Sequence, residues 1–189
     1  MSPGSPPPEV ARLFLALWPT AAVRNAIAGW RSAWRWPPSA RHVRHDRLHL
    51  TLHFIGAVER ERLPELKQGL AVAFEPFEIV GGPPEVWRHG VAVQRLDETP
   101  SSLVQLHKTL GAALRKLALP VEASPFAPHV TLARHAAGAV GPAAGAPWHW
   151  AVHGYRLVES LPGGAGYVAL ARYPSLRPTA RSSSAKAST

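Results

Sequence analysis

The sequence predicts an α+β protein built on mostly antiparallel sheets. Three observations lead to this class. Short runs of strand-forming residues are bounded by proline or glycine, three longer segments repeat apolar residues at helical spacing, and neighbouring strands are close enough in sequence to pair as hairpins. The predicted order is β-α-β-α-β-β-β-α-β-β-β, and helices interspersed with groups of strands are typical of α+β domains. The 189 residues are 46% hydrophobic, which is enough for one domain with a substantial core.

The first half of the chain alternates strands with helices. Thr20 is a suitable N-cap for the first helix, in which Trp30 and Trp34 belong to an apolar face at helical spacing. Pro64 falls in the first turns of the second helix, where a helix tolerates proline. In order, these strands and helices are expected over 13–18, 21–34, 48–55 and 61–73.

The second half is richer in strands. Its helix opens after Pro100, carries a stripe of leucines and alanines, and closes at Pro120. A loop rich in alanine, glycine and proline is expected over 136–147, and a turn at 162–164 joins the last two strands. The strands are expected over 77–80, 86–88, 91–96, 129–134, 150–159 and 166–173, and the helix over 101–118.

The two ends of the chain differ in composition from the middle. Residues 1–10 are proline-rich and are expected to form a flexible leader, and residues 177–189 a disordered basic tail. A single domain of two pseudo-symmetric lobes is expected over 11–176. The amino terminus lacks the apolar core of a signal peptide, and no apolar run approaches the roughly 20 residues of a membrane span. The default expectation is therefore a cytoplasmic monomer without membrane contact.

Charge and cysteine content limit the chemistry of the protein. Lysine and arginine total 21 against 12 acidic residues, which gives a net charge of +9. Such a balance is compatible with binding nucleic acid or another polyanion, and equally with a basic solvated surface. The sequence contains no cysteine, so disulfides, thiolate catalysis and cysteine-based zinc or iron–sulfur sites are excluded.

One tetrapeptide pattern occurs twice: His49-Leu50-Thr51-Leu52 and His129-Val130-Thr131-Leu132. Both copies consist of residues that favour strands. On a strand the histidine and the threonine share one face, while the two apolar residues share the other. A single copy would be explained most simply as a structural histidine beside a β-branched residue. Two copies suggest two similar half-domains and, if the strands lie side by side, one face that carries two imidazoles and two hydroxyls.

Such a face is suited to acid–base chemistry on a phosphate. The unperturbed pKa of histidine, about 6.5, lets it give or take protons near neutrality. Of two histidines flanking a phosphodiester, a neutral one removes a proton from the attacking oxygen and a protonated one gives a proton to the departing oxygen. Thr51 and Thr131 would donate hydrogen bonds to the non-bridging oxygens and stabilise their negative charge. This chemistry requires no metal and no cofactor.

The histidine spacing also allows a metal-binding interpretation. His49 and His53 are four residues apart, and His129 and His135 are six apart. A spacing of four brings two ligands together on a helix, whereas residues 48–55 are predicted to form a strand. On that strand His49, Thr51 and His53 would line one face, and no metal site is expected.

The two tetrapeptides and their flanks resemble the two signatures of the two-histidine (2H) phosphoesterases. The first signature corresponds to 49–56 and the second to 126–134. More specifically, the chain resembles the bacterial and archaeal RNA 2′,3′-cyclic phosphodiesterases, also called LigT or 2′-5′ RNA ligases. Supporting segments lie at 12–19, 157–160 and 166–174, and the resemblance covers roughly residues 11–176.

The resemblance implies a bilobal fold, in which two mostly antiparallel sheets, with helices outside, meet in a cleft that receives one His-x-Thr strand from each lobe. The implied substrate is RNA, and the implied reaction opens a 2′,3′-cyclic phosphate to leave a 2′-phosphate. His49 corresponds to the proton donor to the 3′ oxygen and His129 to the proton acceptor that activates water. Thr51 and Thr131 correspond to the threonines that hold the phosphate. Arg134 matches an arginine that contacts phosphate, and Phe54 an aromatic residue that stacks on the terminal base.

Three positions do not follow simply from this pattern. Strict alternation places Phe54 and Arg134 on the face opposite the histidines, so a bend, twist or bulge would have to redirect them. Without such a redirection, Phe54 would pack in the core and Arg134 would form a surface or interlobe ion pair. His53 departs from the small residue that is usual there, and it would crowd the cleft, add a phosphate contact or shift a neighbouring pKa.

The sequence leaves other functions open. The substrate could be a 2′-5′-linked oligonucleotide or a small cyclic nucleotide phosphate, with ligation as a side activity, or the chain could be a non-catalytic RNA-binding module. Trp87, Trp148 and Trp150 could serve as RNA platforms, although packing in the core or at a lobe edge is the simpler expectation.

Overall fold

The computed structural model describes residues 9–143 and 148–176. Residues 1–8 of the predicted leader and the whole predicted tail, 177–189, lie outside the described residues. Val10, the last residue of the predicted leader, already belongs to the first strand. The remaining elements follow the predicted order, with one additional short strand, earlier helix ends and two changes in how the strands are divided.

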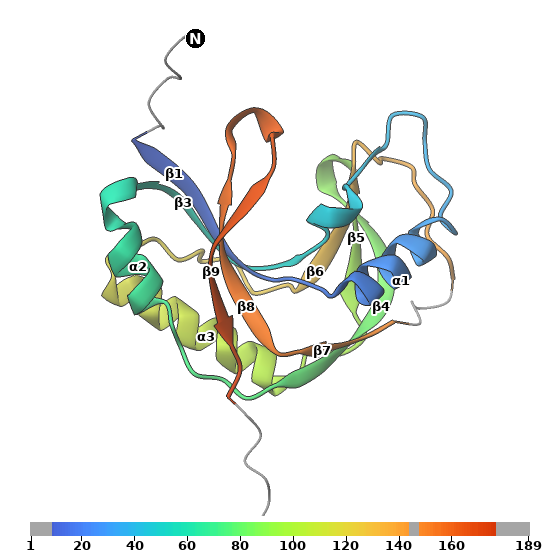
Figure 1. Cartoon of the computed structure of the whole chain (residues 1–189). Coiled ribbons are helices and arrows are strands. Elements are labelled where there is room, and N and C mark those ends of the chain that lie inside the picture. Colours follow the sequence, from blue (N-terminus) through green and yellow to red (C-terminus); the bar gives the residue numbers. More distant parts are fainter. Residues whose placement is uncertain (1–8, 144–147, 177–189) are drawn as a thin grey trace, which may run out of the picture.

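In the described part of the chain, nine strands are joined into one antiparallel sheet that curls into an open half-barrel (Figure 1). From one edge to the other the order is β7-β4-β5-β6-β3-β1-β8-β9, and the two-residue strand β2 pairs with β6. The bounds are β1 Val10–Leu17, β2 Arg41–His42, β3 Leu50–Glu59, β4 Phe77–Trp87, β5 Val91–Leu96, β6 His129–Arg134, β7 His149–Val152, β8 Gly154–Ser160 and β9 Tyr167–Pro174.

One arm of the sheet consists of β7, β4, β5 and β6, and the other of β3, β1, β8 and β9. The sheet is narrowest where the two arms meet, between β3 and β6. Each of these strands pairs along much of its length with the neighbour in its own arm, but they share only the pair Leu50–Val130. The α+β class and the antiparallel pairing are confirmed. The expected two sheets, however, are joined at this point into one, because strand twist separates the two arms on either side of a single shared pair.

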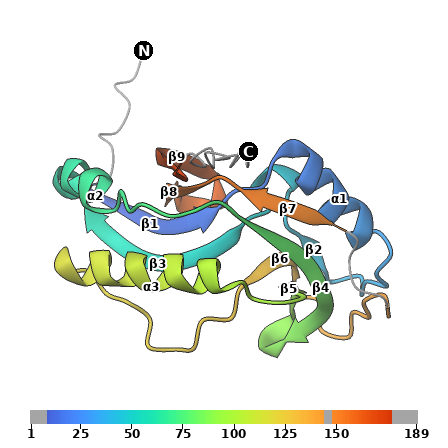
Figure 2. The same cartoon turned by 90° about the horizontal axis from the view of Figure 1, so that it is seen from below.

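The described residues form three α-helices, and these lie outside the curve of the sheet (Figure 2). Their bounds are α1 Ala21–Arg31, α2 Leu63–Gly69 and α3 Ser101–Lys116. Thr20 caps α1 as predicted, since its Oγ1 accepts a hydrogen bond from the Val23 amide at 3.3 Å. The buried face of α3 consists of leucines at helical spacing and one glycine, Gly111. None of the helices in the described ranges has the length and apolarity needed to cross a membrane.

The helices α1 and α2 end earlier than predicted, because residues expected in their last turns form hydrogen bonds with distant parts of the chain instead. After α1, Arg35 and Val140 exchange both backbone hydrogen bonds, at 2.9 and 3.0 Å, so Trp34 leaves the helix. After α2, the Tyr155 hydroxyl donates to the Leu70 carbonyl at 2.7 Å and accepts from the Val72 amide at 2.8 Å. These bonds replace the ones that a continued helix would make.

Two strand boundaries also differ from the prediction. β4 is one strand where two were expected, because a register shift between Gly81 and Pro84 accommodates the prolines that would otherwise interrupt pairing. The expected strand 150–159 is instead two strands, β7 and β8, because the chain changes partner between them. β7 pairs with β4 in one arm, and β8 pairs with β1 and β9 in the other. Gly154 begins β8 where a Cβ atom would lie only 2.9 Å from the Tyr173 carbonyl oxygen.

Candidate active site

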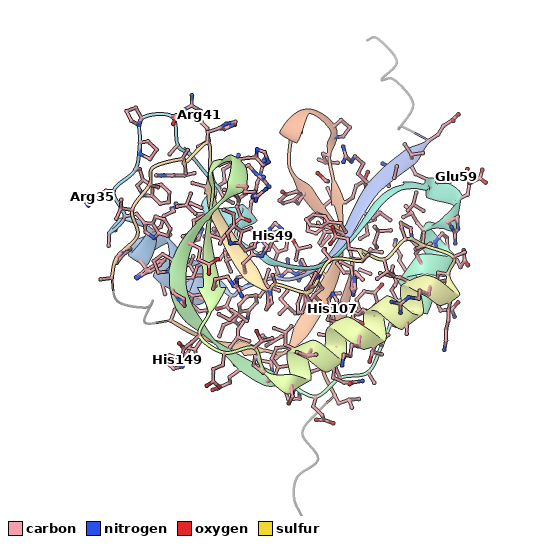
Figure 3. The ribbon with its side chains drawn as sticks, turned by 180° about the vertical axis from the view of Figure 1, so that it is seen from behind. Arg35, Arg41, His49, Glu59, His107 and His149 are labelled. Atoms are coloured by element: carbon pink, nitrogen blue, oxygen red, sulfur yellow. The ribbon has the colours of Figure 1, made fainter. Side chains whose placement is uncertain are left out.

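A cavity of about 710 Å³ lies between the two arms of the half-barrel. Figure 3 shows His49 between the arms on the open side of the sheet. Residues from both arms line the cavity, including the histidines and threonines of both tetrapeptides. The lining consists of Arg12, Leu13, Phe14, Val43, Arg47, His49, Thr51, Phe54, Gly56, Trp87, Val91, His129, Thr131, Arg134, Ser160 and Tyr167.

The pairing of β3 with β6 brings the two His-x-Thr units together. Leu50 of the first unit is the antiparallel partner of Val130 of the second. Continuing that register by one residue in each direction sets His49 opposite Thr131 and Thr51 opposite His129. Leu50 and Val130 are fully buried, whereas the histidines and threonines of the two units are half-buried and line the cavity. The four side chains therefore form one group around a local two-fold arrangement.

Both histidine rings are held in the same way. The Nδ1 atom of His49 lies 2.6 Å from the Arg47 carbonyl oxygen, and that of His129 lies 2.7 Å from the Ala127 carbonyl oxygen. In each case the carbonyl belongs to the residue two positions earlier. Because a carbonyl oxygen only accepts hydrogen bonds, each Nδ1 carries the proton and each neutral ring keeps Nε2 free to accept one. The two units thus present the same ring nitrogen to a ligand.

Aromatic rings surround His49 on the β1–β3 arm. Trp18 stacks on it with ring centroids 5.2 Å apart and an angle of 6° between the planes. Phe14 lies 5.1 Å away, and Tyr167 meets the imidazole edge-on at 5.4 Å. Burial lowers the pKa of His49 to about 4, against the opposing effect of the Arg47 carbonyl, and His129 and Arg134 lower it further by their charge.

His129 is less enclosed. Trp87 packs against its ring at 4.3 Å with an angle of 64° between the planes. Burial also lowers the pKa of His129, while the Ala127 carbonyl raises it and the charges of Arg95 and Arg134 lower it. Both imidazoles are therefore neutral at pH 7 in the free protein.

A bulge in β3 brings Phe54 into the cavity. His53 is the partner of Leu15 and Thr51 is the partner of Ala16, so Leu52 is an extra residue in β3. After this extra residue the alternation of faces is reversed. Phe54 is consequently 56% exposed and lines the same cavity as Thr51.

A matching bulge in β6 acts in the same way on Arg134. Thr131 is the partner of Val93 and Ala133 is the partner of Ala92, so Leu132 is the extra residue. Leu132 and Ala133 are both fully buried, and Arg134 is exposed and lines the cavity. Each His-x-Thr unit is thus followed by a bulge at its leucine, which turns the residue five positions after the histidine toward the cavity.

The same bulge carries His53 away from the cavity, which corrects the expectation that it shares a face with His49 and Thr51. His53 is 2% exposed and packs beneath α3. Its Nε2 atom lies 2.8 Å from the His107 carbonyl oxygen, and its ring stacks on that of His107 with centroids 4.0 Å apart. His53 neither crowds the cavity nor lines it.

The cavity is basic. Its lining, all of it within the described part of the chain, contains Arg12, Arg47 and Arg134 and no carboxylate. Arg47 also donates to the carbonyl oxygens of Gly164 and Ala165, at 2.9 Å each, and so fastens the turn of the β8–β9 hairpin beside the cavity. An anion would meet only positive or neutral groups here.

Metal ligands do not gather around these histidines. Among the described residues, no group of three or more histidine, cysteine, aspartate or glutamate side chains is placed to hold a metal ion. His49 and His53, four residues apart in sequence, do not form a pair of ligands, because their rings lie on opposite faces of the sheet.

Sequence reasoning missed the aromatic surroundings of the histidines. The sequence places Phe14 and Trp18 only in an apolar strand and at its end, and Tyr167 only in the last strand. Alternation along β1 does put Phe14, Ala16 and Trp18 on one face, and these three form a separate small cluster with Val158. Every residue of the predicted strand 13–18 is apolar, so that range did not reveal which face borders the cavity. Arg12, which precedes it, shares the face of Phe14 and lines the cavity.

A model of the 2′-5′ RNA ligase superfamily matches residues 19–159. The chain belongs to this superfamily. The Escherichia coli (strain K12) protein named RNA 2′,3′-cyclic phosphodiesterase is 33% identical over 155 residues, which cover 80% of this chain and 88% of that protein. A match to this superfamily over most of the chain agrees with the resemblance found in the two His-x-Thr segments.

Solved structures with the superfamily fold also match this chain. A crystal structure described as a phosphoesterase has a TM-score of 0.80 and 30% identity, and the match covers 89% of this chain and all of that one. The apo form of E. coli LigT has a TM-score of 0.78 and 30% identity, with 90% of this chain and all of that chain covered. The complex of the same LigT protein with phosphate has a TM-score of 0.75 and 29% identity over the same shares.

Proposed function

We propose that this protein hydrolyses the 2′,3′-cyclic phosphate at the end of an RNA to a 2′-phosphate, without a metal ion. One observation carries the proposal: two His-x-Thr units from adjacent antiparallel strands line a single basic cavity, and each leaves Nε2 of its histidine available. The activity named for the E. coli relative belongs to the same reaction class.

In the proposed reaction each histidine moves one proton. His129 takes a proton from water through Nε2, and the resulting hydroxide attacks the phosphorus. The bond from phosphorus to the 3′ oxygen breaks, and that oxygen takes its proton from His49. The product carries a 2′-phosphate and a free 3′ hydroxyl. The symmetric geometry is compatible with either assignment of the two roles, and the family resemblance selects His49 as the acid.

The threonines and Arg134 would stabilise the charge of the phosphate. Thr51 and Thr131 sit across the β3–β6 pair from the opposing histidines, so their hydroxyls flank the same point in the cavity. A hydroxyl donates one hydrogen bond to a non-bridging oxygen, and a guanidinium donates two in a planar fork. These donors act most strongly when the transition state gathers negative charge.

The lowered pKa values of the two histidines have a consequence for this mechanism. A neutral His129 is ready to act as a base, whereas His49 must gain a proton before it can act as an acid. A phosphodiester bound between the rings brings a negative charge close to both, and this raises the pKa of each imidazole. We therefore assign the protonation of His49 to the complex with substrate rather than to the free protein.

The remaining lining residues suit the rest of an RNA end. Phe54 presents an exposed aromatic face at the cavity, and a base can stack on such a face whatever its identity. Arg12 and Arg47 provide positive charge for the phosphates that precede the terminal nucleotide. The substrate class is accordingly an RNA end with a cyclic phosphate.

The test is product analysis on an RNA oligonucleotide that ends in a 2′,3′-cyclic phosphate, in the presence of EDTA. The unmodified protein is expected to give the 2′-phosphate, and His49→Ala or His129→Ala to reduce the rate about 10²- to 10⁴-fold. His149→Ala is the matched control, because His149 is exposed on β7 and lies outside the cavity. Full activity of either cavity variant, loss of activity in EDTA, or a 3′-phosphate product would contradict the proposal.

A further inference from the structure

A second, smaller cavity adjoins the active-site cavity on the side of His129. We call it the Phe126 cavity, and its volume is about 230 Å³. Four residues line both cavities, namely Thr51, Phe54, Trp87 and His129, so the two spaces are neighbours with a common wall. The remaining lining of the Phe126 cavity consists of Leu52, His107, Glu122, Ser124, Pro125, Phe126 and Ala127.

His107 and Phe126 form one wall of the Phe126 cavity, and their rings belong to a stack of three that continues to the buried His53. His53 stacks on His107 with centroids 4.0 Å apart at 16°, and His107 stacks on Phe126 with centroids 3.9 Å apart at 17°. The His107 carbonyl holds His53 at 2.8 Å, which ties the stack to α3. Burial lowers the pKa of His107 to about 4, so at pH 7 this wall presents neutral aromatic faces.

The lining of the Phe126 cavity is suited to a base and unsuited to a phosphate. In contrast to the three arginines of the active-site cavity, the lining of the Phe126 cavity, entirely from the described residues, contains no lysine or arginine. Trp87 and Phe126 offer flat apolar surfaces, on which nucleobases stack. Glu122 and Ser124 add one carboxylate and one hydroxyl, and a carboxylate accepts hydrogen bonds from the amino group of a base.

The position of the Phe126 cavity indicates which nucleoside of a substrate would reach it. It borders His129 but neither His49 nor Arg134. Under the proposed function, His129 takes the proton from the oxygen that attacks the phosphorus, on the side opposite the 3′ oxygen. When that oxygen belongs to a nucleoside rather than to water, it is the 5′ hydroxyl of a second nucleoside, and the bond that forms is a 2′-5′ phosphodiester.

We propose that the Phe126 cavity binds the base of the nucleoside that contributes the 5′ oxygen of a 2′-5′ phosphodiester, and that Glu122 favours a base with an amino group there. This inference rests on the proposed function, because it uses the assignment of His129. It adds a binding site for a second nucleoside and a residue that determines which base the site accepts.

The chemistry of this second substrate is balanced by the same two histidines. In cleavage, neutral His49 takes the proton of the 3′ hydroxyl, and the 3′ oxygen attacks the phosphorus. The bond to the 5′ oxygen breaks, and the 5′ oxygen takes a proton from protonated His129. The products are a 2′,3′-cyclic phosphate and a 5′ hydroxyl, and the reverse sequence of steps forms the 2′-5′ bond.

The experiment compares two kinds of substrate. The first kind is cytidine 2′,3′-cyclic phosphate, which has no second nucleoside. The second kind is a pair of 2′-5′-linked dinucleotides that differ only in the 5′-linked nucleoside, cytidine or uridine. The unmodified protein is expected to cleave the cytidine dinucleotide faster, by about tenfold, because only cytosine donates an amino hydrogen to the carboxylate.

Glu122→Gln is expected to remove most of this preference and to leave hydrolysis of the cyclic mononucleotide within about twofold of the unmodified protein. Glu98→Gln is the matched control, since Glu98 is exposed and lines neither cavity. Phe126→Leu tests the aromatic wall, and it is expected to raise KM several-fold for both dinucleotides only, with the folded state checked by circular dichroism.

The outcomes separate this inference from the proposed function. If the unmodified protein hydrolyses the cyclic mononucleotide but prefers neither dinucleotide, or cleaves neither, the Phe126 cavity is not the second nucleoside site and the proposed function stands. An equal effect of Glu122→Gln on all three substrates would also overturn the inference. Inactivity on every substrate would overturn the proposed function and this inference together.

Discussion

Trp18 and His49 lie face to face, with their ring centroids 5.2 Å apart and their planes 6° from parallel. The Arg156 guanidinium lies 5.3 Å from the centre of the same indole ring. The imidazole is thus covered by an aromatic surface on one face, and its Nδ1 atom is fixed to the Arg47 carbonyl. Burial of this kind disfavours the charged form, and it is the main cause that lowers the pKa of His49 to about 4.

Removing the indole should therefore raise the pKa of His49. Trp18→Ala exposes the ring to water, and the pKa is expected to move from about 4 toward the ordinary value of 6.5. Trp18→Phe keeps an aromatic face over the imidazole and is expected to change the pKa less. NMR titration of the His49 ring protons measures both shifts, and an unchanged pKa in Trp18→Ala would show that the stack is not the cause.

The pH dependence of the unmodified protein should be displaced toward acid. The profile of kcat/KM reports the pKa values of the free protein, and those of both His49 and His129 are lowered. The form with a neutral base and a protonated acid is therefore most populated below pH 6.5. A bell-shaped profile with its maximum below pH 6.5 is expected for hydrolysis of a cyclic mononucleotide. A maximum above pH 7 would contradict the conclusion that burial lowers the pKa values of the two histidines.

The stack of His53 and His107 should make the fold sensitive to acid. Both pKa values are lowered in the folded state, chiefly by burial, while Glu122 raises that of His53 and Arg115 lowers it. Between pH 6.5 and about 4, the unfolded chain binds protons that the folded chain does not. The free energy of unfolding therefore falls as the pH decreases through this window, and it stays at its full value above pH 6.5.

A single variant isolates this contribution. His107→Phe keeps a ring in the stack and preserves the backbone carbonyl that holds His53, but it removes one titrating group. The loss of stability between pH 7 and pH 4.5, measured by urea unfolding, is expected to be smaller in the variant than in the unmodified protein. Since His53, His49 and His129 still titrate, part of the dependence is expected to remain. An identical pH dependence in the two proteins would refute the assignment to His107.

Arg134 should contribute to substrate binding through its fork of donors. Arg134→Ala is expected to raise KM for a cyclic-phosphate RNA about tenfold, which is the effect of losing one charged hydrogen bond to phosphate. Arg134→Lys keeps the charge but loses the planar fork, so it is expected to restore only part of the affinity. Steady-state kinetics at fixed ionic strength provides the measurement. Unchanged KM values in both variants would show that Arg134 does not bind the phosphate of the substrate.

The sequence predicted much of this protein from periodicity alone. Apolar alternation located the strands that carry His49 and His129, and the leucine stripe located the helix that became α3. The repeat of His-x-Thr, together with the family resemblance, predicted that the two strands would lie side by side with their polar faces on one cavity. The pair Leu50–Val130 joins these strands. Such features depend on neighbours within a few residues, and the sequence contains them directly.

Other features depended on partners distant in the chain. The end of α1 is determined by the bridge between Arg35 and Val140, and the end of α2 by the hydroxyl of Tyr155. The separation of β7 from β8 follows from a change of pairing partner rather than from any break in the apolar pattern. No local signal distinguishes these positions from a continuing helix or strand.

By itself, the sequence determined that each histidine shares a face with the threonine two residues later, because side chains on a strand alternate. Only the tertiary structure decided what lies on that face beyond the threonine. The register of β3 against β1, and of β6 against β5, inserts one extra leucine in each strand. That insertion reverses the alternation, so Phe54 and Arg134 enter the cavity while His53 is buried under α3. A bulge belongs to a pair of strands, and one strand read alone does not contain it.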